Sequence, residues 1–339
     1  MMRPSYLREG AADATIVGNR SKMTSAYLSD VASASAFFPL PSKSSDARCV
    51  RVAQYNMNTL AGADWKSPKS GEEADAVLAF LGADVLLLQE ADTQSFPDRA
   101  PFNKGVMGAI DQDATNTRVH DLHARLRERG YTLISSDGCF NPPLLATRLP
   151  VLDASAAFVA DRGPTVAALD ADGGEFRTAR CVLLDAGQGR TLRVVSAHLH
   201  HNESASLRGS RLAEAAHILE RLDALSGAAP AQATVVAGDF NCGRERDYSP
   251  AEWDVVTRGL ANVNQPPADG VSEAFEAAGY RTTYDLSGAG QPGLTHWTGT
   301  AVDFAYVKGA TIEVAGVHMH YTTLSDHLPV IHDLLIPFP

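Results

Sequence analysis

The sequence lacks the features of a disulfide-rich or membrane-spanning protein. Its four cysteines, Cys49, Cys139, Cys181 and Cys242, lie far apart and form no C-x-x-C pair, so they indicate neither a disulfide framework nor a zinc site. No apolar run approaches the roughly 18 residues that a membrane-spanning helix requires. We therefore expect buried free thiols and no stable membrane insertion.

Basic residues are also fewer than acidic ones. The chain has 29 Lys and Arg against 40 Asp and Glu, a net charge of -11, which argues against a broad basic surface for nucleic acid. A local groove is not excluded, because the segment 177–211 holds six arginines against only Asp185 and Glu203. This arginine-rich segment is a candidate for phosphate contacts.

The first 46 residues are rich in Ser and Ala and have no charged-then-apolar signal-peptide pattern. We expect a poorly ordered extension over 1–46, followed by one catalytic domain over 47–339. We also expect an intracellular monomer. Its compartment is left open, with organellar targeting by residues 1–46 as an alternative.

From residue 48 onward, apolar strand-like runs alternate with helical patterns. Ser70 and Glu73 form a capping box, and the helix they begin is expected to end near Gly82. The apolar run 85–88 predicts a buried strand that delivers Glu90 to its end. The local pattern therefore places a carboxylate at the mouth of a strand.

Further along, the segment 180–200 predicts two strands joined by a turn over 187–189, the second ending at His198. A helical pattern follows, and then the strand "ATVVAGDFN" again ends in polar residues. Hairpins mixed with helices exclude a simple doubly wound parallel sheet. They favour an α/β fold with two packed mixed β-sheets flanked by helices.

Five segments share one design, an apolar strand that ends in residues able to bind a cation or a phosphate. They are "RVAQYNMN", "VLLLQE", "VVSAHLH", "VVAGDFN" and "SDHLPV". Each alone has an ordinary explanation, because a Glu after a strand is usually solvated and "GDFN" can be a simple Asx turn. Their order along one chain is what makes the set informative.

This ordered set resembles the endonuclease/exonuclease/phosphatase superfamily of metal-dependent phosphoesterases, over residues 48–336. The matching residues are Asn56, Gln89, Glu90, His198, 238–241, Asp303 and 325–327. The segment "NPPLLATRLPV" also looks like a family motif, with Asn141 in the matching place and Thr147 where Ser is usual. The resemblance implies a four-layer α/β sandwich.

The chemistry of such a site needs hard oxygen ligands for Mg²⁺ or Mn²⁺. On the resemblance, Glu90 is the main protein ligand, Asn56 lies beside it, and Asp326 is a supplementary ligand. One departure concerns Asn58, which stands where the abasic-site endonuclease branch has Asp. That branch, and a second tight carboxylate ligand, are therefore less favoured.

The resemblance assigns the catalytic roles as well. Asp239 acts on the attacking water, and Asn241 fixes that water or donates to the phosphate. His198 and His327 donate to non-bridging oxygens. Strand alternation puts Asp303 on a face where its carboxylate needs a partner, and His327 is the natural one, although such a pair can also be purely structural. Asn141 is expected to contact the substrate.

Two activities and one inactive alternative follow. The first is Mg²⁺- or Mn²⁺-dependent hydrolysis of a nucleic-acid phosphodiester, in RNA or DNA, by in-line water attack. The alternative is a phosphatase or phospholipase C-type hydrolase of phosphoinositides or sphingomyelin, since the same core serves many substrates. A non-catalytic binding scaffold is disfavoured, because every central polar residue is present.

Overall fold

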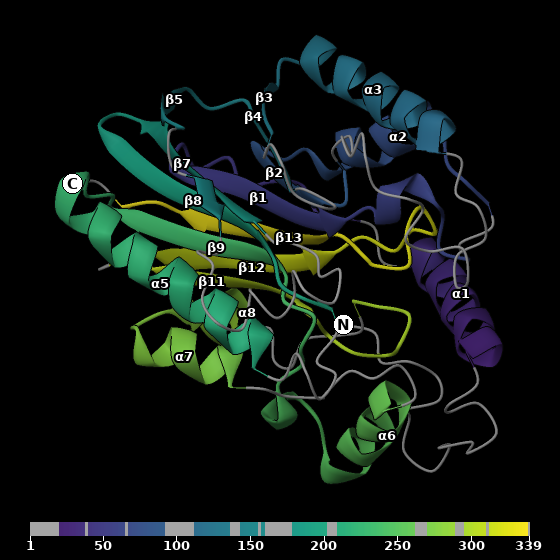
Figure 1. The fold of residues 1–339 in the computed structure, drawn as a ribbon. Helices are drawn as coiled ribbons and strands as arrows, with labels where there is room; N and C mark the ends of the chain where they lie inside the picture. Colours follow the sequence, from purple (N-terminus) through teal and green to yellow (C-terminus); the bar gives the residue numbers. More distant parts are fainter. Residues whose placement is uncertain are drawn as a thin grey trace.

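The fold was obtained as a computed structural model (Figure 1). It describes residues 20–37, 40–64, 67–91, 112–135, 143–154, 157–159, 178–201, 209–261, 270–288, 295–309 and 312–337. The expected substrate contact Asn141 lies outside these residues. All structural statements below concern the described part of the chain.

Helices and strands alternate along the described chain. The helices are α1 (Arg20–Phe37), α2 (Gly71–Leu81), α3 (Gln112–Glu128), α5 (Ser210–Ala228), α6 (Pro250–Ala261), α7 (Val271–Ala277) and α8 (Thr283–Ser287). The strands are β1 (Cys49–Asn56), β2 (Val85–Gln89), β3 (Thr132–Ile134), β4 (Leu144–Thr147), β5 (Val151–Asp153), β6 (Ala157–Val159), β7 (Thr178–Gly187), β8 (Arg190–His198), β9 (Ala233–Asp239), β10 (Arg281–Thr282), β11 (Asp303–Lys308), β12 (Glu313–Met319) and β13 (Val330–Leu335).

The strands form two mixed sheets. The first has six strands in the order β12-β13-β1-β2-β4-β3, and the second has seven, in the order β10-β11-β9-β8-β7-β5 with β6 paired to β7. The pairs β1–β2 and β8–β9 are parallel, whereas the other strand pairs of the two sheets are antiparallel. The expected pair of packed mixed sheets is confirmed.

The sheets pack face to face, with helices outside them. Side chains such as Val52 and Leu87 of the first sheet and Val194 and Val235 of the second share one fully buried cluster between the sheets. Helices α2 and α3 cover the other face of the first sheet. Helices α5 and α7 cover the other face of the second sheet (Figure 1). The result is the four-layer α/β sandwich that the sequence predicted.

Local signals in the sequence act where they were expected. The Ser70 hydroxyl accepts from the Glu73 amide and the Glu73 carboxylate accepts from the Ser70 amide, so the capping box is present. Gly82 ends the helix in the left-handed conformation, with φ 61°. The turn at Gly187 and Gly189 joins β7 to β8 as an antiparallel hairpin.

Helix α1 lies inside the segment 1–46, for which the sequence predicted little order. Tyr27, Val31 and Ala34 of this helix are buried and belong to the same apolar cluster as Leu328 and Val330. Their spacing of four and three residues places them on one face of a helix. The described part of the extension is therefore packed onto the domain, while the boundary at residue 47 stays a prediction.

Candidate active site at the ends of the two sheets

The polar residues meet where parallel strands of both sheets end. Asn56 is paired with Gln89 at the ends of β1 and β2, and Glu90 follows directly. His198 is paired with Asp239 at the ends of β8 and β9. Across the two sheets, the Gln89 amide donates to the Ser196 hydroxyl at 3.2 Å. Packing of the sheets thus brings two sets of strand ends to one place.

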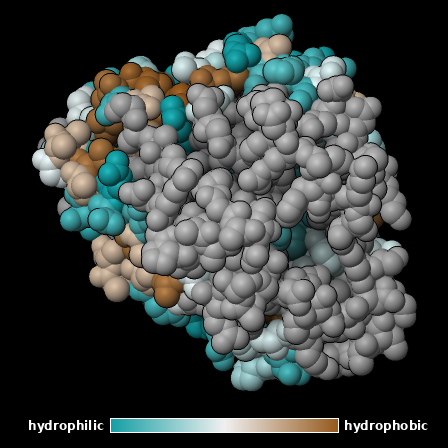
Figure 2. Space-filling model, viewed as in Figure 1, coloured by the Kyte–Doolittle hydropathy of each residue, from teal (hydrophilic) through white to brown (hydrophobic). Residues whose placement is uncertain are grey.

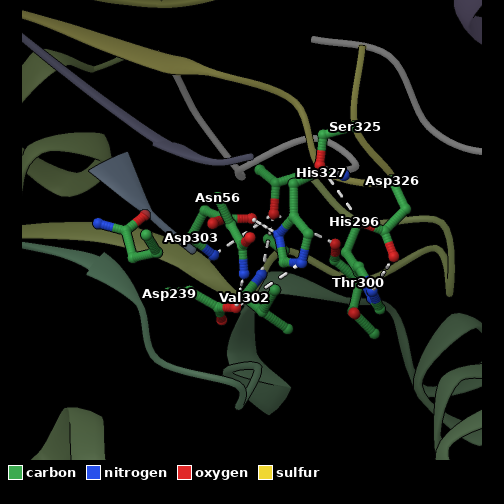
Figure 3. A network of polar contacts seen from close by, with 12 residues as sticks. Asn56, Asp239, His296, Thr300, Val302, Asp303, Ser325, Asp326 and His327 are labelled. Carbon is green, nitrogen blue, oxygen red and sulfur yellow. Dashed lines mark hydrogen bonds and ion pairs between the residues drawn. The ribbon is translucent and has the colours of Figure 1, made fainter. Parts of the chain in front are cut away.

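Two further segments complete the cluster. Strand β11 runs antiparallel to β9 and begins at Asp303, which is paired with Asp239. The connection between β12 and β13 carries residues 325–327, and Ser325 Oγ accepts from the His327 amide at 3.2 Å. Figure 3 shows His327 lying between Asp303 and Asp239. The site is therefore built from segments that span almost the whole domain.

Gly238 is required for the close approach of β8 and β9 beside Asp239. Its φ is +152°, and a Cβ added there would lie 1.8 Å from the carbonyl oxygen of Ala197. No side chain other than hydrogen fits in that space. The glycine of "GDFN" therefore sets the distance between the strands that carry His198 and Asp239.

Glu90 and Asn56 bring an anionic and an amide group to the centre. Glu90 has φ 52°, an uncommon left-handed conformation for a glutamate, which marks a position held by its surroundings. The Asn56 amide donates to Glu90 Oε1 at 3.3 Å and to Asp239 Oδ2 at 3.0 Å. Its Oδ1 accepts from the backbone amide of Asn58 at 2.9 Å, and this bond fixes the orientation of the Asn56 side chain.

Asp239 is a buried carboxylate with a raised pKa. Burial is the main cause, the charge of Asp303 adds to it, and the result is a pKa of about 6 despite the opposing effects of His327 and the hydrogen bond from Asn56. The Oδ1 of Asp239 accepts from the backbone amide of Asn241 at 2.8 Å, and its Oδ2 accepts from the side-chain amide of Asn56. A group with this pKa is poised to accept a proton near neutral pH.

His327 is held by the two aspartates of the second sheet. Its Nδ1 bonds Asp303 Oδ2 at 2.9 Å, and its Nε2 lies 3.7 Å from Asp239 Oδ2. Burial by itself lowers the pKa of His327, but Asp303 and Asp239 outweigh burial and raise it to about 10. The expected Asp303–His327 contact is present, and the imidazole carries a proton at neutral pH.

His198 joins the same group from β8. Its Nε2 lies 3.6 Å from Asp239 Oδ2 and 3.9 Å from Glu90 Oε1. The side chain is almost fully buried. The second predicted histidine therefore shares one carboxylate with His327, and the Nε2 atoms of both imidazoles lie within 3.7 Å of Asp239 Oδ2.

Asn241 makes contacts that hold the turn after β9. Its side-chain amide donates to the Leu199 carbonyl at 2.9 Å, and its φ of 52° is one that Asn tolerates well. The buried guanidinium of Arg211 donates to the Asn241 carbonyl. These contacts position Asp239, and the expected contact of Asn241 with phosphate stays a prediction.

Three arginines of the arginine-rich segment are buried in the fold. Arg190, Arg193 and Arg211 are all at most 2% exposed. Arg193 donates to backbone carbonyls of α5 and the residue that follows it, and Arg190 bonds the Ala47 carbonyl. Their burial leaves the half-buried Arg180 as the described arginine of this segment with the most exposure, so phosphate contacts from the segment stay a prediction.

Asp326 has a neighbour that the sequence did not identify. His296 Nε2 lies 3.9 Å from Asp326 Oδ2, and the His296 ring centroid lies 4.4 Å from that of His327. Asp326 Oδ1 accepts from Ser325 Oγ at 3.3 Å. The role of Asp326 as a supplementary Mg²⁺ ligand stays a prediction, and His296 is a site residue without a local sequence signal.

The donor set near Glu90 fits a hard divalent cation. Glu90 Oε1 and Asp239 Oδ2 converge on one amide nitrogen of Asn56, and two carboxylates so close are stabilised by a cation between them. Asn56 would become an oxygen ligand only by turning its amide and giving up the bond from Asn58. Glu90 is therefore the better-placed ligand of the two.

Fold and polar cluster together define an α/β sandwich with a carboxylate, amide and imidazole site where the two sheets end. The sequence profile of the Endonuclease/Exonuclease/phosphatase family matches residues 53–327, and the chain belongs to this family. The family name covers nucleases and phosphatases, which are hydrolases of phosphate esters. The resemblance stated from the motifs is confirmed.

Solved structures share the fold at low sequence identity. An endonuclease/exonuclease/phosphatase from Beutenbergia cavernae is 18% identical, with 85% of this chain and 72% of that chain covered and a TM-score of 0.55. A conserved protein from Enterococcus faecalis described as functionally unknown is 17% identical, with 85% and 100% covered and a TM-score of 0.56. Truncated TDP2 from Caenorhabditis elegans is 14% identical, with 85% and 98% covered and a TM-score of 0.53. No curated protein sequence matches the chain.

Proposed function

We propose that the protein is a Mg²⁺- or Mn²⁺-dependent phosphodiester hydrolase that acts on RNA or DNA by in-line attack of water. The observation that carries this proposal is the position of His327, bonded to Asp303 and 3.7 Å from Asp239 Oδ2. A protonated donor and a carboxylate acceptor thus stand side by side at one point of the site. Phosphodiester hydrolysis needs both.

The histidines act on the phosphate. His327 donates its Nε2 proton to a non-bridging oxygen, and Asp303 keeps the proton on Nδ1 and stabilises the imidazolium. His198, at the end of β8, lies near the same Asp239 oxygen and also donates to a non-bridging oxygen. Negative charge that develops on the phosphate is therefore met by preorganised donors.

Asp239 acts on the attacking water. Its raised pKa of about 6 makes it a better proton acceptor than an ordinary aspartate. The backbone amide of Asn241 fixes the orientation of its carboxylate. A cation held by Glu90, with Asn56 and Asp326 nearby, would supply charge neutralisation for the phosphate and the leaving oxygen. Asn141 is kept as a proposed substrate contact.

The exposed hydrophobic side chains of the protein favour a nucleic-acid substrate over a lipid. The large hydrophobic side chains exposed among the described residues are Phe80 on α2, Leu152 on β5 and Leu212 on α5. Helices α2 and α5 cover opposite outer faces of the sandwich, so Phe80 and Leu212 do not share the continuous apolar surface that a lipid-bound protein uses. Figure 2 shows the hydropathy of the face of the molecule that is seen in Figure 1. Within the described part of the chain, no helix has the length and apolar character that crossing a bilayer requires.

The test is hydrolysis of a substrate panel by the full-length protein. The panel contains single-stranded RNA and DNA, duplex DNA, a phosphoinositide and sphingomyelin, each with Mg²⁺, with Mn²⁺ and with a chelator. The variant His327→Ala removes the proposed phosphate donor. His120→Gln, at an exposed position on α3, is the matched control.

We expect cleavage of nucleic acid that requires the cation, that falls by at least about 100-fold in His327→Ala, and that is unchanged in His120→Gln. Hydrolysis of only the lipid substrates would replace nucleic acid with the alternative substrate class. Absence of hydrolysis from the whole panel, with a folded protein, would contradict the proposal.

A further inference from the structure

His296, Asp326 and His327 form a compact group, and the proposed reaction gives no role to His296. Each offers one ligand atom, and these atoms all lie within 4.8 Å of one another. Asp326 and His327 are largely buried, and the His296 side chain is 13% exposed. Figure 3 shows His296 and Asp326 on the side of His327 away from Asp239. The group therefore joins His296 to two residues, Asp326 and His327, that also belong to the candidate active site.

Both imidazoles are oriented by a bond at their other nitrogen. His327 Nδ1 bonds Asp303 Oδ2 at 2.9 Å, and His296 Nδ1 bonds Thr298 Oγ1 at 2.6 Å. Thr298 Oγ1 in turn bonds Thr300 Oγ1 at 2.8 Å. Bonds of this kind fix the tautomer that presents Nε2, and they are the usual outer contacts of metal-binding histidines.

The backbone holds the two histidines in register. His296 and His327 form an isolated antiparallel bridge. On either side of it, the Leu328 amide donates to the Thr295 carbonyl at 2.7 Å, and the Trp297 amide donates to the Asp326 carbonyl at 3.0 Å. The three side chains therefore project from a paired backbone rather than from independent loops.

The donor types differ from those at the neighbouring oxygen site. Two imidazole nitrogens and one carboxylate are the ligands that Zn²⁺ and similar ions prefer, whereas Mg²⁺ prefers oxygen ligands alone. We propose that His296, Asp326 and His327 bind a Zn²⁺-type ion at a second position, next to the Mg²⁺ or Mn²⁺ site around Glu90, and that Asp326 is a ligand of whichever ion is bound. Three protein ligands leave the fourth position for water or a substrate oxygen.

The shared ligand gives this site a regulatory consequence, which rests on the proposed function. A metal on Nε2 of His327 uses the lone pair that otherwise carries a proton, so a ligating His327 cannot donate to a phosphate. Zn²⁺ therefore inhibits hydrolysis while Mg²⁺ supports it. The metal binding itself does not depend on the protein being a hydrolase.

Binding is tested by calorimetric titration of Zn²⁺ into the full-length protein in excess Mg²⁺. Four proteins are compared: the unmodified chain, His296→Gln, Thr298→Val and the control His120→Gln. We expect one Zn²⁺ per chain, with affinity at least about 100-fold weaker in His296→Gln, about 10-fold weaker in Thr298→Val, and unchanged in His120→Gln. Equal Zn²⁺ affinity in His296→Gln and the unmodified chain would overturn the site.

A second readout keeps the test independent of folding defects and of activity. Co²⁺ in place of Zn²⁺ gives a visible spectrum that reports its ligands, and Thr298→Val leaves all three proposed ligands present. We expect the spectrum of a low-coordinate imidazole site in both the unmodified chain and Thr298→Val. Thr298→Val should need about 10-fold more Co²⁺ to reach it. A spectrum of fully hydrated Co²⁺ in the unmodified chain would contradict the proposal.

The inhibition is tested separately, as the fraction of hydrolysis that remains when Zn²⁺ is added. We expect inhibition of the unmodified chain at Zn²⁺ concentrations that do not inhibit His296→Gln. Zn²⁺ binding without inhibition would overturn the regulatory consequence alone. If no substrate is hydrolysed, the calorimetric result still decides whether the metal site exists.

Discussion

Asp303 and Asp239 are register partners on β11 and β9, and His327 lies between their carboxylates. Only Asp303 bonds the imidazole closely, at 2.9 Å, whereas Asp239 Oδ2 stands 3.7 Å from Nε2. One aspartate therefore fixes the histidine, and the other keeps its oxygen for another partner. The two paired strands β9 and β11 therefore present two carboxylates with different roles, Asp303 toward the histidine and Asp239 toward the water.

The first prediction concerns the pH dependence of hydrolysis. Asp239, with its pKa raised to about 6, must lose its proton to act on water, so activity rises as pH passes about 6. His327, with its pKa raised to about 10, must keep its proton, so activity falls as pH passes about 10. The profile of kcat/KM against pH is expected to be bell-shaped between these values.

Asp303→Asn tests the assignment of the alkaline limb. The substitution removes the charge that contributes most to raising the pKa of His327, so the alkaline limb should move to lower pH. A purely structural role for Asp303 would lower the rate without moving that limb. An unmoved limb in a folded variant would therefore refute the assigned role.

The second prediction concerns the cation requirement. Glu90→Gln keeps the size of the side chain but removes its charge, and we expect the Mg²⁺ concentration for half-maximal activity to rise at least about 10-fold, because ligand charge sets cation affinity. Glu220→Gln, at an exposed position on α5, is the control and should change nothing. Equal Mg²⁺ dependence in both variants would exclude Glu90 as the main ligand.

The third prediction concerns a buried ion pair between β1 and β13. Arg51 Nε and Nη2 each donate to Asp333 at 2.7 Å, and both side chains are at most 5% exposed. Asp333→Asn leaves a buried guanidinium without its counter-charge, so we expect about 3–5 kcal/mol of lost stability in urea denaturation. Asp121→Asn, which breaks the exposed Asp121–Arg125 pair, should cost less than about 1 kcal/mol.

The same pair gives an acid limit to stability. Burial alone raises the pKa of Asp333, but hydrogen bonds from Arg51 and His318 outweigh it and lower the pKa from 3.8 to about 2. Because the folded-state pKa is depressed, the contribution is present above pH 4 and is lost as pH falls toward 2. It amounts to about 2 kcal/mol. An Asp333→Asn variant should lose that part of the pH dependence.

The fourth prediction concerns Gly238. Gly238→Ala places a methyl group against the Ala197 carbonyl and forces β8 and β9 apart, so we expect a loss of at least about 2 kcal/mol. Gly227→Ala is a matched control, because this exposed glycine lies in α5 with nothing within 4 Å of an added Cβ. It should stabilise the protein by about 0.5–1 kcal/mol. Similar melting temperatures for the two variants would contradict this account.

The sequence predicted the parts of the fold that depend on local chemistry. The capping box at Ser70 and the stop at Gly82 need only neighbouring residues, and so does the glycine turn before β8. The contact of Asp303 with His327 was predicted because strand alternation and the family motifs agree. These features are encoded within a few residues or within an ordered set of motifs.

What depends on long-range packing was missed. His296 reaches the site only because its segment pairs with the one that carries His327, and no spacing in the sequence encodes that bridge. Arg193 and Arg211 belong to the segment expected to contact phosphate, although they bond backbone carbonyls inside the fold. Tyr27 and Val31 are different, since their four-residue spacing was a usable helical signal in a segment judged by composition alone.

The docking of the two sheets has a consequence for how the protein becomes active during folding. Glu90 and Asn56 come from the first sheet, and Asp239 and Asp303 from the second, so neither sheet carries a complete set of reacting groups. A folding intermediate with one formed sheet therefore has no catalytic capacity. Recovery of activity during refolding reports the docking of the sheets, rather than the earlier formation of secondary structure.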